Sequence, residues 1–180
     1  MLIAIISDIH DNETNLKKVL DYCRENKITK IVCCGDLASD ETLDFMADNF
    51  GFSTESEIFY TFGNADEDRF GNLAIEQYNK SGKDFTKYKN VKIFREYGET
   101  AIERNAIAFV HFPDKAKKLG ETGKYNFVFY GHTHRPWEES VSDCKILNPG
   151  NVTGQYYLPT FAVWDTNGDD FKLIRIHDLN

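Results

Sequence analysis

The sequence is poor in basic charge, in long hydrophobic runs and in paired cysteines, and each shortage excludes a class of protein. The 180 residues include 21 Lys and Arg against 29 Asp and Glu, which gives a formal charge of −8. Broad, sequence-independent nucleic-acid binding needs a basic surface, so we do not expect it. A phosphorylated substrate is still allowed, because a bound cation can reverse the sign of the local electric field.

The apolar run at residues 1–6 ends at Ser7 and Asp8, and no basic segment precedes it. It is too short for a signal peptide or a membrane span and is typical of a buried strand. The four cysteines form no CxxC pair, which predicts free, buried thiols in a protein without an export signal. We therefore expect a cytoplasmic protein with no membrane partner. The length and the absence of repeats or linkers predict one domain over residues 1–180.

Strand-like and helix-like segments alternate along the first third of the chain. Apolar runs at residues 3–6, 31–34 and 58–62 predict strands, and helical spacing at 16–23 and 40–50 predicts helices, the first capped by Asn12 or Thr14. This alternation indicates an α/β protein with a parallel central sheet. In such sheets the site lies beyond the carboxyl ends of the strands, where the tetrads SDIH, CGDL and GNAD stand.

The later part of the chain has a different pattern of apolar and polar residues. Residues 66–90 predict a helix followed by a mobile loop. Beyond residue 91, a helix is expected near 113–119, and apolar runs predict strands at 106–110, 127–130, 145–147, 161–164 and 171–176. Asn167-Gly168 is a strong hairpin signal. These runs predict a second, largely antiparallel or mixed sheet, so the expected architecture is two packed sheets flanked by helices.

Seven polar residues at the ends of these runs are candidates for metal binding. Asp8 and His10 are two residues apart, as are His132 and His134, so we expect each pair to leave an extended segment on one face. The other three are Asp36, Asn64 and His111, and only His177 among the five histidines lies outside the set. Oxygen and nitrogen ligands without a thiolate suit Mn²⁺, Fe²⁺, Zn²⁺, Co²⁺, Ni²⁺ or Mg²⁺. Seven ligands are too many for one structural zinc and suit two ions that share a carboxylate.

The ordered set DxH, GD, GN, H and GHxH resembles the calcineurin-like metallophosphoesterases, especially their small YfcE-like branch, over residues 7–150. Asn148-Pro149-Gly150 is similar to the NPG turn of that branch. The resemblance implies a four-layer α/β/β/α sandwich and hydrolysis of a phosphodiester rather than a phosphomonoester. The implied substrate is a phosphorylated small molecule or a nucleotide-like compound.

The resemblance also implies two divalent ions, most simply Mn²⁺. It assigns Asp8, His10, Asp36 and His134 to the first ion, with Asp36 as the bridge, and it completes the second ion with Asn64, His111 and His132. A hydroxide bridging the ions and held through Asp36 would attack phosphorus in line, with Asn64 stabilising the developing charge. Asp66 is expected to orient a neighbouring group or water.

Two positions depart from the family pattern. Many members have a histidine where this chain has Ala65, and its loss predicts a bias toward good leaving groups or use of another general acid. The branch usually reads HGH where this chain has His111-Phe112-Pro113, a change that bears on substrate access and affinity.

Each candidate residue taken alone has an ordinary structural explanation. Asp8 suits a helix N-cap or a turn, Asp36 and Asn64 after glycine suit turns, and His111 suits a hydrogen-bonded strand end. A rival to the enzyme is a weakly active or inactive metal-binding scaffold for protein partners, like the retromer member of the family. The sequence does not define the oligomeric state.

Overall fold

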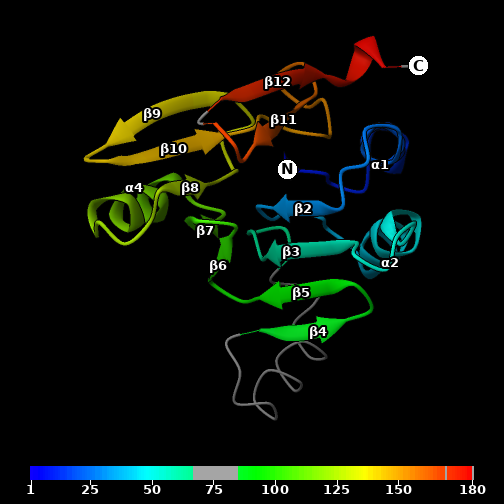
Figure 1. The fold of residues 1–180 in the computed structure, drawn as a ribbon. Coiled ribbons are helices and arrows are strands. Elements are labelled where there is room, and N and C mark those ends of the chain that lie inside the picture. Colours follow the sequence, from blue (N-terminus) through cyan, green and yellow to red (C-terminus); the bar gives the residue numbers. More distant parts are fainter. Residues whose placement is uncertain (67–84, 169, 180) are drawn as a thin grey trace.

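Two β-sheets pack face to face, and helices cover their outer faces (Figure 1). The computed structural model describes residues 1–66, 85–168 and 170–179. In this part of the chain the helices are α1 (Glu13–Glu25), α2 (Asp40–Phe50), α4 (Pro113–Glu121) and a short 3₁₀-helix η1 (Ile176–Asp178). Figure 1 shows α1 and α2 side by side on one flank, with α4 on the other. This arrangement is the predicted four-layer α/β/β/α sandwich.

The larger sheet has seven strands in the order β12-β11-β1-β2-β3-β5-β4. These are β1 (Leu2–Ile6), β2 (Lys30–Cys33), β3 (Glu57–Thr61), β4 (Thr86–Tyr88), β5 (Val91–Phe94), β11 (Thr160–Asp165) and β12 (Phe171–Arg175). Strands β1, β2, β3 and β5 run parallel, whereas β4, β11 and β12 pair antiparallel. The predicted parallel centre is confirmed, and its carboxyl ends all lie at one edge.

The second sheet has five strands in the order β6-β7-β8-β10-β9. These are β6 (Tyr97–Ile102), β7 (Asn105–Val110), β8 (Phe127–Phe129), β9 (Trp137–Val141) and β10 (Cys144–Asn148). Strands β7, β8 and β10 are parallel, and the outer two pair antiparallel. The sheet is mixed, as expected.

The sequence-based assignment of later strands to the second sheet was partly wrong. Strands β11 and β12 belong to the first sheet, and β11 lies antiparallel to β1 with Ala4 opposite Val163. A fully buried strand reads as a continuous apolar run in either sheet, so the run alone does not say which partner it takes. Strand β4 lies where a loop was predicted, and the helix predicted after Asp66 falls outside the described residues.

Three apolar layers hold the sandwich together. One lies between the first sheet and helices α1 and α2, one between the two sheets, and one between the second sheet and α4. Trp164 of β11 is fully buried in the middle layer, and its ring centroid lies 4.6 Å from that of Phe127 and 5.9 Å from that of Phe129. The middle layer therefore fixes the spacing of the two sheets.

Several predictions from local sequence signals agree with the structure. The side chain of Asn12 caps α1 by accepting a hydrogen bond from the Asn15 N–H at 3.0 Å, and the hairpin predicted at Asn167-Gly168 joins β11 to β12. All four cysteines are buried and free, and burial raises the pKa of Cys23 to about 12. Among the described residues, no helix combines the length and apolarity that crossing a bilayer requires.

Replacing Trp164 with alanine is expected to lower the free energy of unfolding by about 3–5 kcal/mol, because it leaves a cavity between the sheets. Leu173→Ala in the adjacent strand is the matched control, since Leu173 is 47% exposed and the change should stay within about 0.5 kcal/mol. Urea denaturation followed by circular dichroism measures both. Equal losses in the two variants would contradict this account of the middle layer.

Candidate metal centre

All seven candidate residues come together where the carboxyl ends of five strands meet. Asp8 and His10 follow β1, Asp36 follows β2 and Asn64 follows β3 in the first sheet. From the second sheet, His111 follows β7, and His132 and His134 follow β8. Contacts among these side chains connect them in one cluster that includes residues from both sheets.

The first group in the cluster consists of Asp8, His10 and His134. Nε2 of His134 lies 3.3 Å from Oδ1 of Asp8, and Nε2 of His10 lies 4.0 Å from the same oxygen. The two imidazole centroids are 5.2 Å apart. One potential ligand atom from each residue lies within 4.8 Å of the other two, which is a separation suited to one bound ion.

The second group consists of Asn64, His111 and His132. Oδ1 of Asn64 lies 2.9 Å from Nδ1 of His132 and 3.1 Å from Nε2 of His111. The His111 and His132 ring centroids are 5.1 Å apart. Nδ1 of His111 makes a hydrogen bond of 2.8 Å with the carbonyl of Cys34, which anchors the ring to the end of β2.

Asp36 lies between the two groups. Its Oδ2 is 3.5 Å from Nε2 of His10 and 3.3 Å from Nε2 of His111. Its Oδ1 accepts a hydrogen bond of 2.8 Å from the backbone N–H of Ala65. One carboxylate oxygen thus approaches nitrogens of both groups, as a bridging ligand must.

The backbone at these residues differs from the sequence expectation. Asp8, His10, Asp36, His132 and His134 all have positive φ, between 45° and 68°. The prediction that the pairs leave an extended segment on one face was therefore wrong, because both pairs lie in tight turns beyond the strands. Non-glycine residues in this region carry a cost of about 1–3 kcal/mol each, which the surrounding contacts must offset. Such clustering of backbone strain is typical of functional sites.

Two glycines permit the close packing of these turns. A Cβ added at Gly63 would lie 2.1 Å from Oδ1 of Asp36, and one added at Gly131 would lie 2.8 Å from Oδ2 of Asp8 and 1.9 Å from Oγ of Ser7. Any side chain at either position would displace a carboxylate of the cluster. Gly63 and Gly131 therefore also leave room for the carboxylates of Asp36 and Asp8.

Asp66 is fully buried beneath the cluster, where its carboxylate accepts hydrogen bonds from the backbone. Its Oδ2 accepts backbone hydrogen bonds from Asp36 (2.7 Å) and Gly63 (2.8 Å), and its Oδ1 accepts one from Ala38 (2.9 Å). Burial raises the pKa of Asp66, although the hydrogen bonds from Gly63 and Ala38 oppose that change. Asp66 ties the turn after β2 to the turn after β3, so it positions Asp36 from below the cluster.

Two asparagines support the cluster in a way that sequence reasoning missed. Nδ2 of Asn148 donates to the carbonyl of Gly131 (2.8 Å) and to Oγ1 of Thr133 (3.0 Å), and Nδ2 of Asn151 donates to the carbonyl of His134 (2.9 Å). The NPG turn was noticed in the sequence, but its role in holding the GHTH turn was not. The signal was Asn148-Pro149-Gly150-Asn151 itself, two polar amides around a turn after a buried strand.

The charges in the cluster alter the pKa values of its members. The hydrogen bond to Asp8 raises the pKa of His134. Burial would lower the pKa of His111, but the hydrogen bond and the charge of Asp36 outweigh it and raise the value. Burial would likewise raise the pKa of Asp36, yet the His111 interactions bring it below the ordinary range. These carboxylates therefore favour positive charge at neighbouring positions.

The chemistry of the donor set fits divalent cations. Nε2 of His10 is buried near the carboxylates of Asp8 and Asp36 but makes no hydrogen bond among the described residues, so an ion bound there would satisfy this nitrogen. Asp8, Asp36 and His111 form a second trio of ligand atoms within 4.8 Å of one another, sharing Asp8 with the first. Oxygen and nitrogen donors without a thiolate suit hard or borderline ions.

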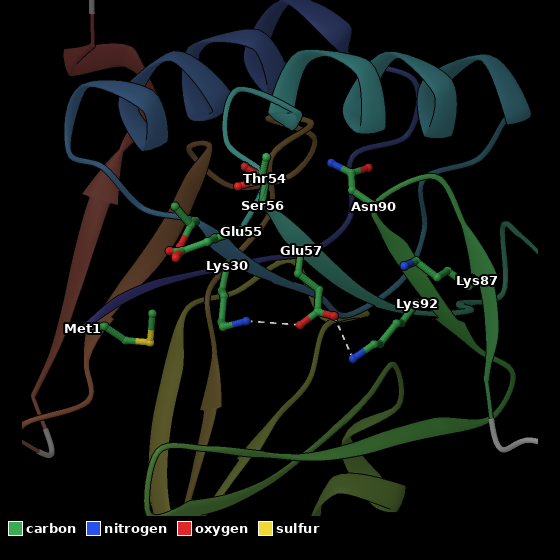
Figure 2. A pocket seen from close by; sticks show the side chains of 10 residues that line it. Met1, Lys30, Thr54, Glu55, Ser56, Glu57, Lys87, Asn90 and Lys92 are labelled. Carbon is green, nitrogen blue, oxygen red and sulfur yellow. Dashed lines mark hydrogen bonds and ion pairs between the residues drawn. The ribbon is translucent and has the colours of Figure 1, made fainter.

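A separate cavity of about 400 Å³ lies at the opposite edge of the first sheet (Figure 2). Figure 2 shows Lys30 and Lys92 reaching Glu57, at Nζ–O distances of 3.1 Å and 2.7 Å. These residues stand near the amino ends of β2, β3 and β5, whereas the metal-binding candidates follow the carboxyl ends. The cavity is not part of the cluster.

Comparison with known proteins connects the cluster to one family. Residues 1–169 match the model of the calcineurin-like phosphoesterase superfamily domain. The chain is 26% identical over 177 residues to phosphodiesterase MJ0936 of Methanocaldococcus jannaschii, covering 97% of this chain and 98% of that protein.

Solved structures show the same fold. A novel archaeal phosphodiesterase is 25% identical with a TM-score of 0.78, covering 97% of this chain and 99% of that one. Yfce, a phosphoesterase from E. coli, is 16% identical with a TM-score of 0.67, covering 100% and 96%. Vacuolar protein sorting 29 from Cryptosporidium parvum is 18% identical with a TM-score of 0.62, covering 96% and 95%. The last two likenesses concern the fold alone.

Asp66→Asn is expected to lower the free energy of unfolding by about 1–3 kcal/mol, because the amide NH₂ cannot accept a buried backbone hydrogen bond. The same change should weaken metal binding about 10- to 100-fold by releasing Asp36. Urea denaturation and titration calorimetry with Mn²⁺ measure the two effects. Asp143→Asn, at an exposed turn, is the control. If both variants behaved alike, Asp66 would have no positioning role.

Metal binding is expected to release protons from His111 and His134. Because the pKa values of both rings are raised, each ring keeps its extra proton at pH values above about 6.5, the ordinary pKa of histidine. This proton must leave before the nitrogen binds an ion. Affinity for Mn²⁺ should therefore rise with pH from about 6 to 8, by up to about tenfold per unit for each proton released. Calorimetry in buffers of different ionisation enthalpy counts the protons. An affinity independent of pH in this range would count against the assignment.

Proposed function

The chain belongs to the calcineurin-like phosphoesterase superfamily, and on that basis we propose that it is a metal-dependent phosphodiesterase with two divalent ions in its active site. The observation that carries this proposal is the position of Asp36, whose Oδ2 lies within 3.5 Å of nitrogens from both halves of the cluster. The 26% identity to phosphodiesterase MJ0936 over nearly the whole chain supports the choice of reaction.

We assign the ligands by the grouping of their atoms. The first ion takes Asp8, His10, Asp36 and His134, and the second takes Asp36, Asn64, His111 and His132. We propose Mn²⁺ for both positions; Fe²⁺, Zn²⁺, Co²⁺, Ni²⁺ and Mg²⁺ also suit a donor set of oxygen and nitrogen. When bound, the ions would supply a hydroxide nucleophile near neutral pH and positive charge against the phosphoryl oxygens.

The chain's own residues orient the substrate. Oδ1 of Asn64 faces the imidazoles of His111 and His132, so the amide nitrogen on the other branch is left to donate to a phosphoryl oxygen. The Asn64 side chain is exposed, which gives a substrate access to it. Asp66 holds the turns that carry Asp36 and Asn64 and has no contact with solvent.

No protonating side chain stands at position 65, where Ala65 replaces the histidine of many relatives. General acid catalysis contributes roughly 10²–10⁴ in rate, so its loss weighs most on esters with poor leaving groups. We therefore propose that the protein prefers phosphorylated small molecules or nucleotide-like diesters with good leaving groups. The four free thiols are consistent with action in the cytoplasm.

The alternative function, a metal-binding scaffold for protein partners, is less well supported. A scaffold has no need to keep every ligand, yet all seven are present and lie in one cluster around Asp36.

We expect the Mn²⁺-loaded protein to hydrolyse bis(4-nitrophenyl) phosphate faster than 4-nitrophenyl phosphate. Asp36→Ala should reduce the rate to background, and His132→Ala should reduce kcat by about 10²–10³-fold, since each removes charge stabilisation at the reacting centre. Release of nitrophenolate at 405 nm provides the assay.

The matched control is His177→Ala, which removes the one histidine outside the cluster and should leave the rate unchanged. Equal rates in the native protein, Asp36→Ala and His132→Ala would refute the proposed function. Metal content must be determined for each variant, so that lost turnover at matched loading is separated from lost metal.

A further inference from the structure

Two aromatic rings stand beside the cluster, each against a different group of ligands. The ring centroid of Phe112 lies 5.1 Å from that of His111 and 5.0 Å from that of His132, in the second group. The ring centroid of Tyr156 lies 5.6 Å from that of His134, in the first group. A phosphate held by the cluster would therefore have an aromatic ring on either side.

Tyr156 is placed in an unusual way for a tyrosine. Its side chain is 89% exposed, the largest exposed fraction among the large hydrophobic residues of the described chain. Its backbone has φ of 67°, a conformation that bulky residues rarely adopt. The preceding residue, Gln155, accepts a hydrogen bond from Nδ1 of His134 at 3.3 Å, so the loop that carries Tyr156 is tied to the cluster. An exposed ring contributes little packing energy to the fold, although the positive φ of Tyr156 carries a conformational cost.

Phe112 shows a similar arrangement on the other side. It is partly buried, precedes α4 and offers α4 no side-chain cap. Nζ of Lys115 lies 5.6 Å from the centre of its ring, which places a positive charge beside the position of an anionic substrate. A ring here shapes the approach to His132, whose side chain is exposed.

We propose that Tyr156 and Phe112 bind planar aromatic groups of the substrate, so that the preferred substrates are phosphodiesters that carry a nucleobase or another aryl group. This inference rests on the proposed function of the cluster. The two organic groups of a diester extend from phosphorus in different directions. The two rings offer a stacking surface on each side of the ligand cluster. Base–aromatic stacking is tolerant of sequence and suits rings that are exposed, as Tyr156 is, or partly exposed, as Phe112 is.

The test compares two substrates with the same leaving group, thymidine 5′-(4-nitrophenyl) phosphate and methyl 4-nitrophenyl phosphate, on the Mn²⁺-loaded protein. The native protein should favour the thymidine ester in kcat/KM. Tyr156→Asn should reduce this preference about tenfold, mainly through KM, because stacking on one ring is lost. Asparagine is chosen since it tolerates positive φ and so preserves the loop. Phe112→Leu should also reduce the preference while keeping an apolar side chain.

Tyr156→Phe retains the ring and should keep the preference. Tyr157→Ala removes the neighbouring, 46% exposed tyrosine and should also keep it. As a measurement independent of turnover, the Kd of thymidine 5′-monophosphate should rise in Tyr156→Asn while that of methyl phosphate stays constant.

The possible outcomes distinguish a failure of aromatic recognition from a failure of the proposed phosphodiesterase function. A preference that falls in Tyr156→Asn, in Phe112→Leu or in both supports aromatic recognition. A preference that is unchanged in both variants, or absent from the active native protein, overturns it and leaves the phosphodiesterase intact. Failure of the native protein to hydrolyse either ester overturns the proposed function, and this inference with it.

Discussion

The contacts of the Asp36 carboxylate depend on the packing of the two sheets. His111, which lies 3.3 Å from this carboxylate, comes from the second sheet, whereas Asp36 itself follows a strand of the first. The contact exists only while the sheets keep their spacing, and that spacing is fixed by large apolar side chains such as Trp164 in the layer between them. The geometry of the polar cluster is thus a result of hydrophobic packing some distance away.

The same dependence explains which parts of the site could be predicted. Asp8, Asp36 and Asn64 could be predicted as neighbours because parallel strands bring their carboxyl ends to one edge, whatever the loops do. The four histidines of the set were recognised from their motif spacing and from the family resemblance. The helix over Asp40–Phe50 and the cap at Asn12 were predictable because their signals are local. The apolar runs also identified most of the strands.

Other features depend on tertiary contacts and have no local signal in the sequence. Strand β11 pairs with β1 across almost the whole length of the chain, and its apolar run would suit either sheet equally well. His10 and His134 have positive φ in turns that make hydrogen bonds with other loops, such as that between Asn151 and the His134 carbonyl. The hydrogen bonds from Asp36 and Ala38 to Asp66 join segments about thirty residues apart, and a single buried carboxylate has no sequence pattern that predicts them.

The hydrogen bond from His111 to the Cys34 carbonyl has a consequence for the proton on that ring. A carbonyl can only accept, so Nδ1 must be the protonated nitrogen of the neutral imidazole, and the lone pair lies on Nε2, which faces Asp36 and Asn64. The bond from His134 to the Gln155 carbonyl selects the same tautomer, with the lone pair directed toward Asp8. Once the extra proton leaves, the backbone therefore selects in both rings the neutral tautomer that can coordinate a cation.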